Sequence, residues 1–272
     1  MKRSRGIVLS MVMIPIACVM AIPFYYIVVN TLKTQEETTS SPLGLPTSLN
    51  LSNYTNVFEN LPIVHSFLNT VYVTATSITL MLAIGSMAAF GVINGKGKFA
   101  TIVGVVLVIA FLIPGQATLV PLYHMLSGVG LVDSLNGLIV MYACGAIFSY
   151  FLILGYMRTV PTELFEAARI DGAGAFRIYR SLVLPLIRPI LVTVGVFQTM
   201  WVWNDFITPN VFISSPEKQT LVLQVYSSVG QFTTDWPAFM TLSIIVLIPM
   251  VIFFIFMQRH IVSGLMSGSV KG

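Results

Sequence analysis

The sequence predicts an all-α membrane protein with six transmembrane helices, and three observations support this fold class. Hydrophobic residues make up 56% of the 272 residues and charged residues only 9%, whereas soluble domains carry about 25% charged residues. Six apolar runs reach the roughly 20 residues that a membrane helix needs. Lys and Arg are distributed unevenly between the segments that join these runs. We therefore expect a single membrane domain over residues 1–272.

The expected spans follow the apolar runs in order. The first run begins after Met-Lys-Arg-Ser-Arg, as a signal peptide does, but it is too long for a signal-peptide core and no cleavage site follows it. We expect it to be retained as a span. Proline and glycine inside the runs predict kinks that packing against other helices tolerates. The expected spans are residues 7–29, 67–93, 99–121, 135–156, 190–208 and 237–258.

Positive charge predicts the orientation, because Lys and Arg are enriched in cytoplasmic segments of membrane proteins. If the N-terminus is cytoplasmic, twelve of the fourteen Lys and Arg residues lie inside, and only Lys33 and Lys218 lie outside. Both termini and the 157–189 segment, which holds five arginines, are then cytoplasmic. The outer segments 30–66 and 209–236 are polar and long enough to contact an external partner, or they are solvated loops.

The first half of the 157–189 segment predicts a short helix at the membrane surface. Thr162 is a suitable residue for the helix N-cap. Glu163 and Glu166 fall in the first turns, where carboxylates favour the positive end of the helix. Three residues at helical spacing form a small face that another protein could approach closely: Leu164, Ala167 and Ala168.

A turn and a second helix follow. Gly172, after Asp171, can adopt the positive φ that commonly ends a helix. The second helix is expected from about residue 175 to residue 184. Pro185 and Pro189 are expected to end it and to begin the next span.

The residues of this helix–turn–helix resemble the EAA signature of bacterial ABC importer permeases. The resemblance implies the type I ABC importer permease fold, with this segment as the coupling loop that enters a cleft of the ATPase subunit and transmits its closure. Within the signature, the residues assigned to ATPase coupling are Glu166, Ala167, Ala168, Asp171, Gly172, Ala173, Phe176 and Pro185, and Leu184 and Pro189 complete the pattern.

The C-terminal residues 258–272 resemble the tail of the six-span subunit of maltose-type sugar permeases. That resemblance implies that Gly268, Lys271 and Gly272 reach the ATPase dimer. The family more often has Thr-Ala-Gly where this chain has Met266-Ser267-Gly268, and this departure leaves the implied role unchanged.

The stretch W-V-W-N-D-F at residues 201–206 resembles another element of the same subunit type. Trp201, Asn204 and Asp205 are therefore candidates for the translocation path. Alternatively, Asp205 is a hydrogen-bond partner at a helix end, and the tryptophans are ordinary residues of the membrane interface.

The sequence gives no sign of catalysis or metal binding in this chain. It lacks the Gly-rich phosphate-binding motif that ends in Gly-Lys-Ser/Thr, so we expect no enzyme activity here and ATP with Mg to bind to partner ATPase subunits. Cys18 and Cys144 are expected to be small buried hydrophobic residues without a disulfide. No basic run indicates nucleic-acid binding.

The resemblance implies a permease subunit of a bacterial sugar importer in the cytoplasmic membrane. Its expected partners are a second permease in a heterodimer, two ATPase subunits, an extracellular or periplasmic solute-binding protein, and membrane lipid. An amino-acid or peptide importer is an alternative within the same class. A secondary transporter is a second alternative, but such a protein needs its own coupling-ion site, usually built on intramembrane carboxylates or broken helices, and no acid lies in mid-span.

The predicted orientation can be tested by labelling single cysteines in intact cells and in inverted vesicles. Cysteines introduced at residues 97 and 175 should react only from the cytoplasmic side, and one at residue 48 only from outside, because of the charge distribution. Labelling of residue 175 from outside would reject the orientation.

Overall fold

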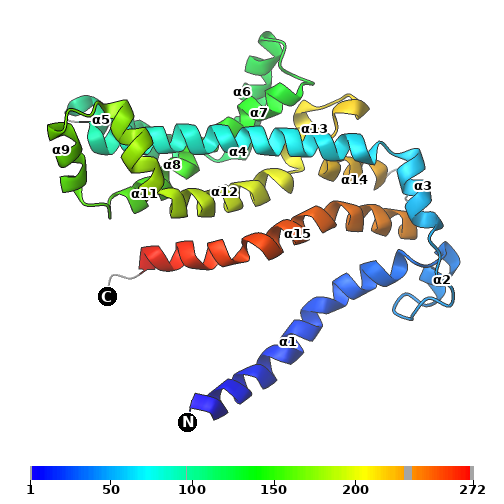
Figure 1. Ribbon diagram of the computed structural model, residues 1–272. Coiled ribbons are helices and arrows are strands. Elements are labelled where there is room, and N and C mark those ends of the chain that lie inside the picture. The colour runs from blue at the N-terminus through cyan, green and yellow to red at the C-terminus, as the bar shows by residue number, and fades with distance from the viewer. Residues whose placement is uncertain (1, 96, 230–234, 270–272) are drawn as a thin grey trace. The chain divides into compact units, whose positions relative to one another are not determined.

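The computed structural model describes residues 2–95, 97–229 and 235–269, and helices dominate throughout (Figure 1). These described residues form no β-strand, and the predicted all-α class is confirmed. Helices suit the apolar runs because a helix pairs its backbone polar groups within one segment, as a bilayer requires. In chain order the helical elements are α1 (Lys2–Asn30), α2 (Gln35–Ser40), α3 (Ser52–Asn60), α4 (Ile63–Asn94), α5 (Lys98–Leu112), α6 (Gly115–Gly128), α7 (Leu135–Ala143), α8 (Ala146–Met157), α9 (Thr162–Ile170), α10 (Ala175–Ile178), the π-helical turn η1 (Tyr179–Val183), α11 (Leu184–Leu186), α12 (Arg188–Trp203), α13 (Ile207–Phe212), the 3-10 turn η2 (Pro216–Lys218), α14 (Leu221–Val229) and α15 (Trp236–Ser269).

Four stretches of helix are long and apolar enough to cross a membrane. They overlap the first, second, fourth and sixth predicted spans. The third and fifth predicted spans instead correspond to bent pairs of helices, so the described residues hold four candidate spans, or up to six if each bent pair is one span. The four stretches are Ser10–Asn30, Ile63–Asn94, Leu135–Met157 and Trp236–Arg259.

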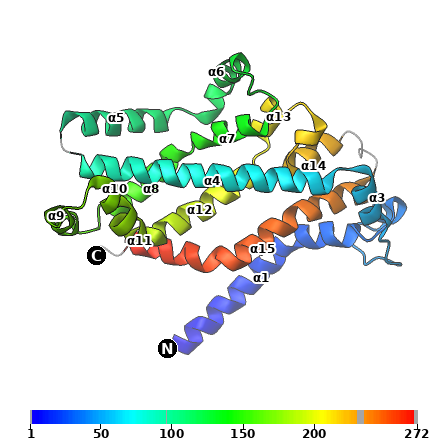
Figure 2. The same ribbon diagram turned by 45° about the horizontal axis from the view of Figure 1, so that its top comes forward.

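The sequence around each bend gives its physical cause. Between α5 and α6 the chain turns by 103° (Figure 2). Ile113 is extended there, with ψ of 121°, because a residue before proline is driven away from helical backbone angles and Pro114 follows. The second bend, of 75°, separates residues 175–186 from α12 at Ile187. Pro189 lies just after it and has no N–H to continue the preceding helix.

The chain divides into two compact units. The first comprises residues 1–64 and 224–249. Within it, the Asn53 side-chain amide of α3 donates hydrogen bonds to the carbonyl oxygens of Thr31 and Lys33, at 2.8 and 2.9 Å. These bonds tie α3 to the segment that follows α1.

The second unit comprises residues 65–223 and 250–272 and contains two clusters of buried apolar residues. One joins α4, α8 and α12 to the helix–turn–helix, and the other joins α4 and α7 to α13. The Gln198 amide of α12 donates to the Gly145 carbonyl at 2.9 Å and to the Ser149 hydroxyl at 3.1 Å. Such bonds hold helices together in lipid, where apolar contact between helices has no water to exclude.

The close approach of α4 to α8 depends on Gly85. A Cβ atom at Gly85 would lie 2.8 Å from the Ser149 Cβ and 2.9 Å from the Tyr150 backbone nitrogen. We expect Gly85→Ala to lower the thermal midpoint of the purified protein, because separating the helices costs about 1–3 kcal/mol. Gly91→Ala in the same helix is the matched control, since nothing lies within 4 Å of its Cβ position. That variant should keep or raise the midpoint, and equal shifts for both would contradict the role of Gly85.

Candidate functional site

The predicted helix–turn–helix is present in the second unit, at the Asn94 end of α4 (Figure 1). α9 begins at Thr162, but its N-cap is Pro161, and no side-chain bond caps the helix. The prediction of Thr162 as N-cap is therefore wrong by one residue. Pro161 is extended, with φ of −58° and ψ of 129°, and the φ locked by its ring suits the start of a helix.

The turn after α9 confirms the predicted positive φ of Gly172, which is 79°. The Gly172 N–H donates to the Arg169 carbonyl at 3.0 Å, and the Ala173 N–H donates to the Ala168 carbonyl at 2.9 Å. These two bonds define a Schellman motif. Nothing lies within 4 Å of a Cβ built on Gly172, so the turn requires glycine for its backbone conformation and not for space.

The second helix differs from its prediction at the C-terminal end. Helical backbone continues through α10, η1 and α11 as far as Leu186, and the break falls at Ile187. Pro185, predicted to end the helix, instead lies in the first turn of α11. Its missing N–H is tolerated there because the π-helical turn before it has already interrupted the regular α-helical bonding.

Buried apolar side chains fix this segment to the rest of the unit. Phe165 of α9 and Ile178 of α10 are 3% and 2% exposed, and both belong to the cluster with Phe90 of α4. The Phe90 ring lies 6.4 Å from the Phe165 ring and 5.6 Å from the Tyr179 ring. The Tyr179 hydroxyl shares a 2.7 Å hydrogen bond with the hydroxyl of Ser86. The segment is thus packed directly against the helices that carry it.

Polar contacts add to this attachment. The Arg169 guanidinium donates a hydrogen bond to the side-chain oxygen of Asn94, the last residue of α4. The bond joins the C-terminal turn of α9 to the C-terminal end of α4. Arg169 also lies in the last turn of α9, where a cation favours the negative end of the helix.

The turn presents apolar side chains to the surroundings. Ile170 is 86% exposed and Phe176 is 71% exposed, one on each side of Gly172. Glu163, Glu166 and Arg177 around them are also exposed. Large exposed apolar side chains with a charged rim mark an interaction surface. The arrangement can bind a partner.

The residues assigned to coupling divide into an outer and an inner group. Ala168 and Ala173 are partly buried against the apolar cluster. The predicted face of Leu164, Ala167 and Ala168 is therefore wrong in one member, because Ala168 lies three residues after Phe165 and shares its buried side. Ile170 takes the outward place, three residues after the exposed Ala167 on the same side of α9. The exposed members are Glu166, Ala167, Asp171, Gly172, Phe176 and Pro185.

The candidates for the translocation path lie at the end of α12. One carboxylate oxygen of Asp205 accepts a 3.0 Å bond from the Tyr142 hydroxyl, and the other accepts the N–H of Ile207 at 2.9 Å. Asp205 is therefore a hydrogen-bond partner at a helix end, at the start of α13, as the alternative interpretation of the sequence expected. Trp201 is half exposed and meets the Tyr142 ring edge-on at 5.6 Å. The Asn204 amide donates to a carbonyl of its own helix, so contact with a solute stays a prediction for these residues.

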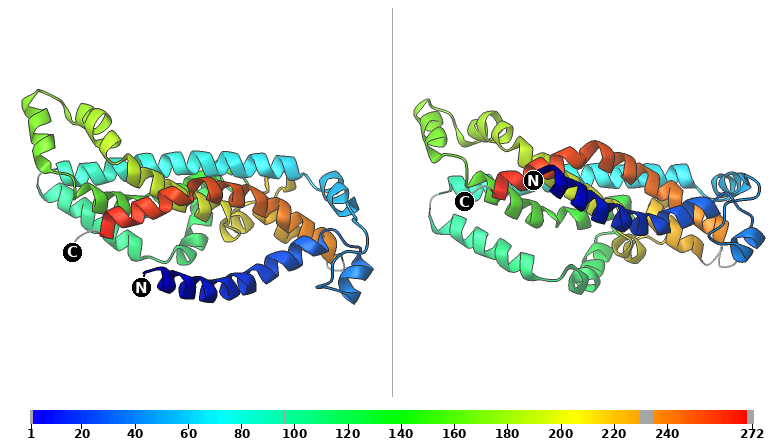
Figure 3. Two further views of the ribbon diagram at one scale, coloured as in Figure 1. Left: turned by 60° about the horizontal axis from the view of Figure 1, so that its bottom comes forward. Right: turned by 90° about the horizontal axis from the view of Figure 1, so that it is seen from below.

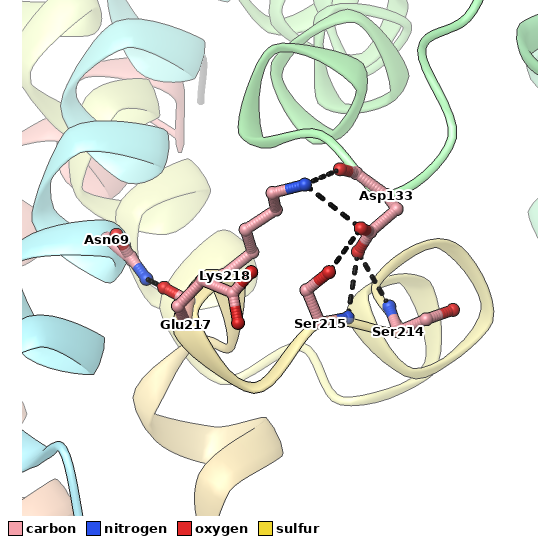
Figure 4. A network of polar contacts seen from close by, with 6 residues as sticks. All are labelled: Asn69, Asp133, Ser214, Ser215, Glu217 and Lys218. Atoms are coloured by element: carbon pink, nitrogen blue, oxygen red, sulfur yellow. Dashed lines mark hydrogen bonds and ion pairs between the residues drawn. The ribbon is translucent and has the colours of Figure 1, made fainter.

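A second polar site, missed from the sequence, centres on Asp133 between α6 and α7 (Figure 4). One oxygen of its carboxylate accepts the N–H groups of Ser214 and Ser215, both at 2.9 Å. The other accepts the Ser215 hydroxyl and pairs with the Lys218 ammonium at 2.9 Å. Asp133 has a φ of 54°, which aspartate tolerates better than most residues. The network fastens the 213–219 loop to the loop before α7.

Two other predictions concern the cysteines and the tail. Cys18 and Cys144 are free thiols, but both are exposed, so the prediction that they are buried is wrong. In a bilayer an apolar residue needs no cover from its own chain. Lys271 and Gly272 lie outside the described residues, and Gly268 lies in α15.

Comparison with known proteins gives a consistent result along the whole chain. Residues 81–267 match the family described as binding-protein-dependent transport system inner membrane component. The chain is 36% identical to the probable starch degradation products transport system permease protein AmyC of Thermoanaerobacterium thermosulfurigenes, over 98% of this chain and 94% of that protein. It is 31% identical to the melibiose/raffinose/stachyose import permease protein MelC of Bacillus subtilis, over 94% of each. A chain of a bacterial ABC transporter that imports the acidic polysaccharide alginate has the same fold, with a TM-score of 0.81, 22% identity and coverage of 94% of this chain and 96% of that one.

The Asp133 network yields a prediction for the 213–219 loop. The Ser215 hydroxyl and N–H, together with Lys218, hold the pKa of Asp133 well below its usual range. Asp133→Asn keeps the shape and the tolerance of positive φ but removes the charge, so we expect a loss of about 1–2 kcal/mol from charge-assisted bonds that are partly exposed. Hydrogen exchange of the Ser214 and Ser215 amides should accelerate, and the thermal midpoint should fall.

The loss of folding stability in Asp133→Asn should depend on pH, in the direction that the lowered pKa of Asp133 determines. A depressed folded-state pKa stabilises the fold above the unfolded-state pKa of about 3.9, and the stabilisation disappears as pH falls through the folded-state value. The difference in midpoint between the native chain and Asp133→Asn should therefore be constant near neutral pH and shrink below about pH 4. A difference that persists undiminished in acid would contradict the charge-based account.

Proposed function

This chain belongs to the family of binding-protein-dependent transport system inner membrane components, and on that premise we propose that it is one permease subunit of an ATP-driven importer of a sugar or oligosaccharide. It forms half of a translocation pathway, and a partner ATPase supplies the energy. The substrate class is supported by relatives of nearly full length whose names refer to starch degradation products and to melibiose, raffinose and stachyose.

The exposed tip of the helix–turn–helix carries the coupling part of the proposal. Ile170 and Phe176 stand outward on a turn whose backbone Gly172 determines. These two side chains enter a cleft of the ATPase subunit and make apolar contacts with its walls. The exposed carboxylate of Glu166 faces the rim of that cleft, where it favours a basic partner surface.

Movement of the ATPase then reaches the membrane through packed side chains. Phe165 and Ile178 are buried against α4, α8 and α12, and close-packed interiors transmit displacement instead of absorbing it. Closure of the ATPase pulls α9 and α10, and the attached spans move with them from an inward-facing to an outward-facing arrangement. A solute-binding protein delivers the sugar to the outer face.

The assembly in this proposal contains five kinds of component. This chain pairs with a second permease in a heterodimer, and two ATPase subunits, which bind ATP and Mg, attach from the cytoplasm. A solute-binding protein docks outside, and membrane lipid surrounds the spans. Both termini of this chain are cytoplasmic, and Gly268, Lys271 and Gly272 contact the ATPase dimer.

The proposal is tested by uptake into proteoliposomes that contain the complete importer. The native complex should take up labelled maltotriose or raffinose with ATP and binding protein present, and should not take up labelled amino acids. Gly172→Val should reduce sugar uptake and co-purification of the ATPase by roughly 5- to 30-fold, because positive φ costs a β-branched residue about 1–2 kcal/mol or more.

Gly174→Val is the matched control two residues away. Gly174 has an extended backbone, with φ of −69° and ψ of 162°, and nothing lies within 4 Å of its Cβ position. It should retain ATPase binding and most of the uptake. If both variants behave like the native complex, the coupling assignment fails. If the native complex takes up amino acids and no sugar, the substrate assignment fails.

A further inference from the structure

The loop of residues 41–51, between α2 and α3 in the first unit, presents leucines to its surroundings. Leu43, Leu45, Leu49 and Leu51 are between 60% and 74% exposed. Residues 38–58 include no Asp, Glu, Lys or Arg. A loop in water rarely combines four exposed leucines with an uncharged run of this length, and exposed apolar surface of this kind marks an interaction site.

The backbone of this loop is held by side chains of α1 and of the segment that follows it, while the leucines remain exposed. The Lys33 ammonium donates to the Ser41 carbonyl at 2.7 Å, and the Asn30 amide donates to the Pro42 carbonyl at 2.9 Å. The Tyr25 hydroxyl donates to the Leu43 carbonyl at 2.9 Å. Figure 3 shows the loop folded back beside the end of α1.

The opposite end of the loop is fixed as well. The Asn50 N–H donates to the Leu32 carbonyl at 2.9 Å. The Thr47 N–H donates to the Glu37 carboxylate of α2, and this bond lowers the pKa of Glu37. The loop therefore has a defined position relative to α1. Because α1 is a candidate membrane span, that position indicates the depth of the loop in the membrane.

Tyr25 sets this depth. The candidate span of α1 ends at Asn30, and five residues of helix rise by about 7 Å, so Tyr25 lies that far inside the end of the span. Tyr25 and Tyr26 are adjacent, and a tyrosine in the last turns of a span extends its hydroxyl toward the boundary between headgroups and acyl chains. Because Tyr25 bonds to Leu43, the loop returns from the end of α1 to the level of this boundary.

We propose that the 41–51 loop is a lipid anchor, with Leu43, Leu45 and Leu49 inserted at the boundary between headgroups and acyl chains beside α1. The partner is membrane lipid because the loop lies at the depth of the interfacial tyrosines and carries no charge for a water-facing protein surface. The predicted orientation assigns it to the outer leaflet. The anchor holds the start of the second span, which follows α3, at a constant depth in the membrane. The proposal requires only that α1 spans the membrane, and neither sugar transport nor ATPase coupling.

The test measures the depth of residue 45 in proteoliposomes of the complete importer. Cys18 and Cys144 are replaced by alanine, and Leu45→Cys is labelled with an environment-sensitive fluorophore. A nitroxide on lipid acyl carbon 5 should quench this label about threefold more than a label at Glu36→Cys on α2, because interfacial segments lie about 5–10 Å deep at the headgroup boundary. Aqueous iodide should show the reverse order.

A second pair of variants tests the contact that sets the depth. Tyr25→Phe cannot donate to the Leu43 carbonyl, so it should shift the label at residue 45 toward iodide. Tyr26→Phe is the matched control, because the structure shows no bond from its hydroxyl to the described loop residues, and it should leave the quenching unchanged. Equal shifts in both variants would overturn the assigned role of Tyr25.

Two results would overturn the lipid anchor. Iodide quenching at residue 45 equal to that at residue 36 would place the loop in water. Protection from both quenchers, or protection from iodide that appears only with added binding protein, would assign the loop to a protein partner. Uptake of labelled sugar is measured in the same vesicles. The uptake result tests the proposed transport function, and the quenching result tests the lipid anchor, so a failure of one is distinguished from a failure of the other.

Discussion

The packing of Phe165 and Ile178 against α4, α8 and α12 is the contact on which the helix–turn–helix depends. Without it, α9 and α10 would be two short helices joined by a turn, and isolated helices of that length are unstable in water. With it, the exposed Ile170 and Phe176 stand on a support that continues into the membrane. In the coupling role proposed above, the same apolar cluster that stabilises the segment also connects its tip to the spans.

The breaks in the helices follow a related constraint. A break inside a membrane is tolerated only where other groups satisfy the freed backbone. Between α7 and α8, the Gly145 carbonyl accepts the N–H groups of Phe148 and Ser149 at 3.1 and 3.3 Å, and the Gln198 amide of α12 adds a third bond to it at 2.9 Å. At Ile187 the break has a different role, because it lets the 175–186 helix leave the direction of α12 and turn toward α9. Proline lies next to both large bends in the backbone, at Pro114 and at Pro189.

Polar bonds to backbone groups also shape two segments that connect longer helices. In one, the carboxylate of Asp133 collects the N–H groups of Ser214 and Ser215. In the other, Tyr25, Asn30 and Lys33 each donate to a carbonyl of the 41–51 loop. Both are side-chain solutions to the requirement that backbone polar groups be paired. Each network fixes a loop to a neighbouring segment through side-chain bonds.

Local properties of the sequence were sufficient for the all-α class, for four of the span positions and for the positive φ of Gly172. Hydropathy and glycine conformation act within one segment, so they can be recognised without the fold. The inward place of Ala168, the continuation of helix through Pro185 and the exposure of Ile170 required tertiary structure, because each depends on which side of a short helix meets the cluster around Phe90. The Asp133 network could not be predicted for the same reason: its partners lie more than eighty residues away, and only the packing of α13 against α7 brings them together.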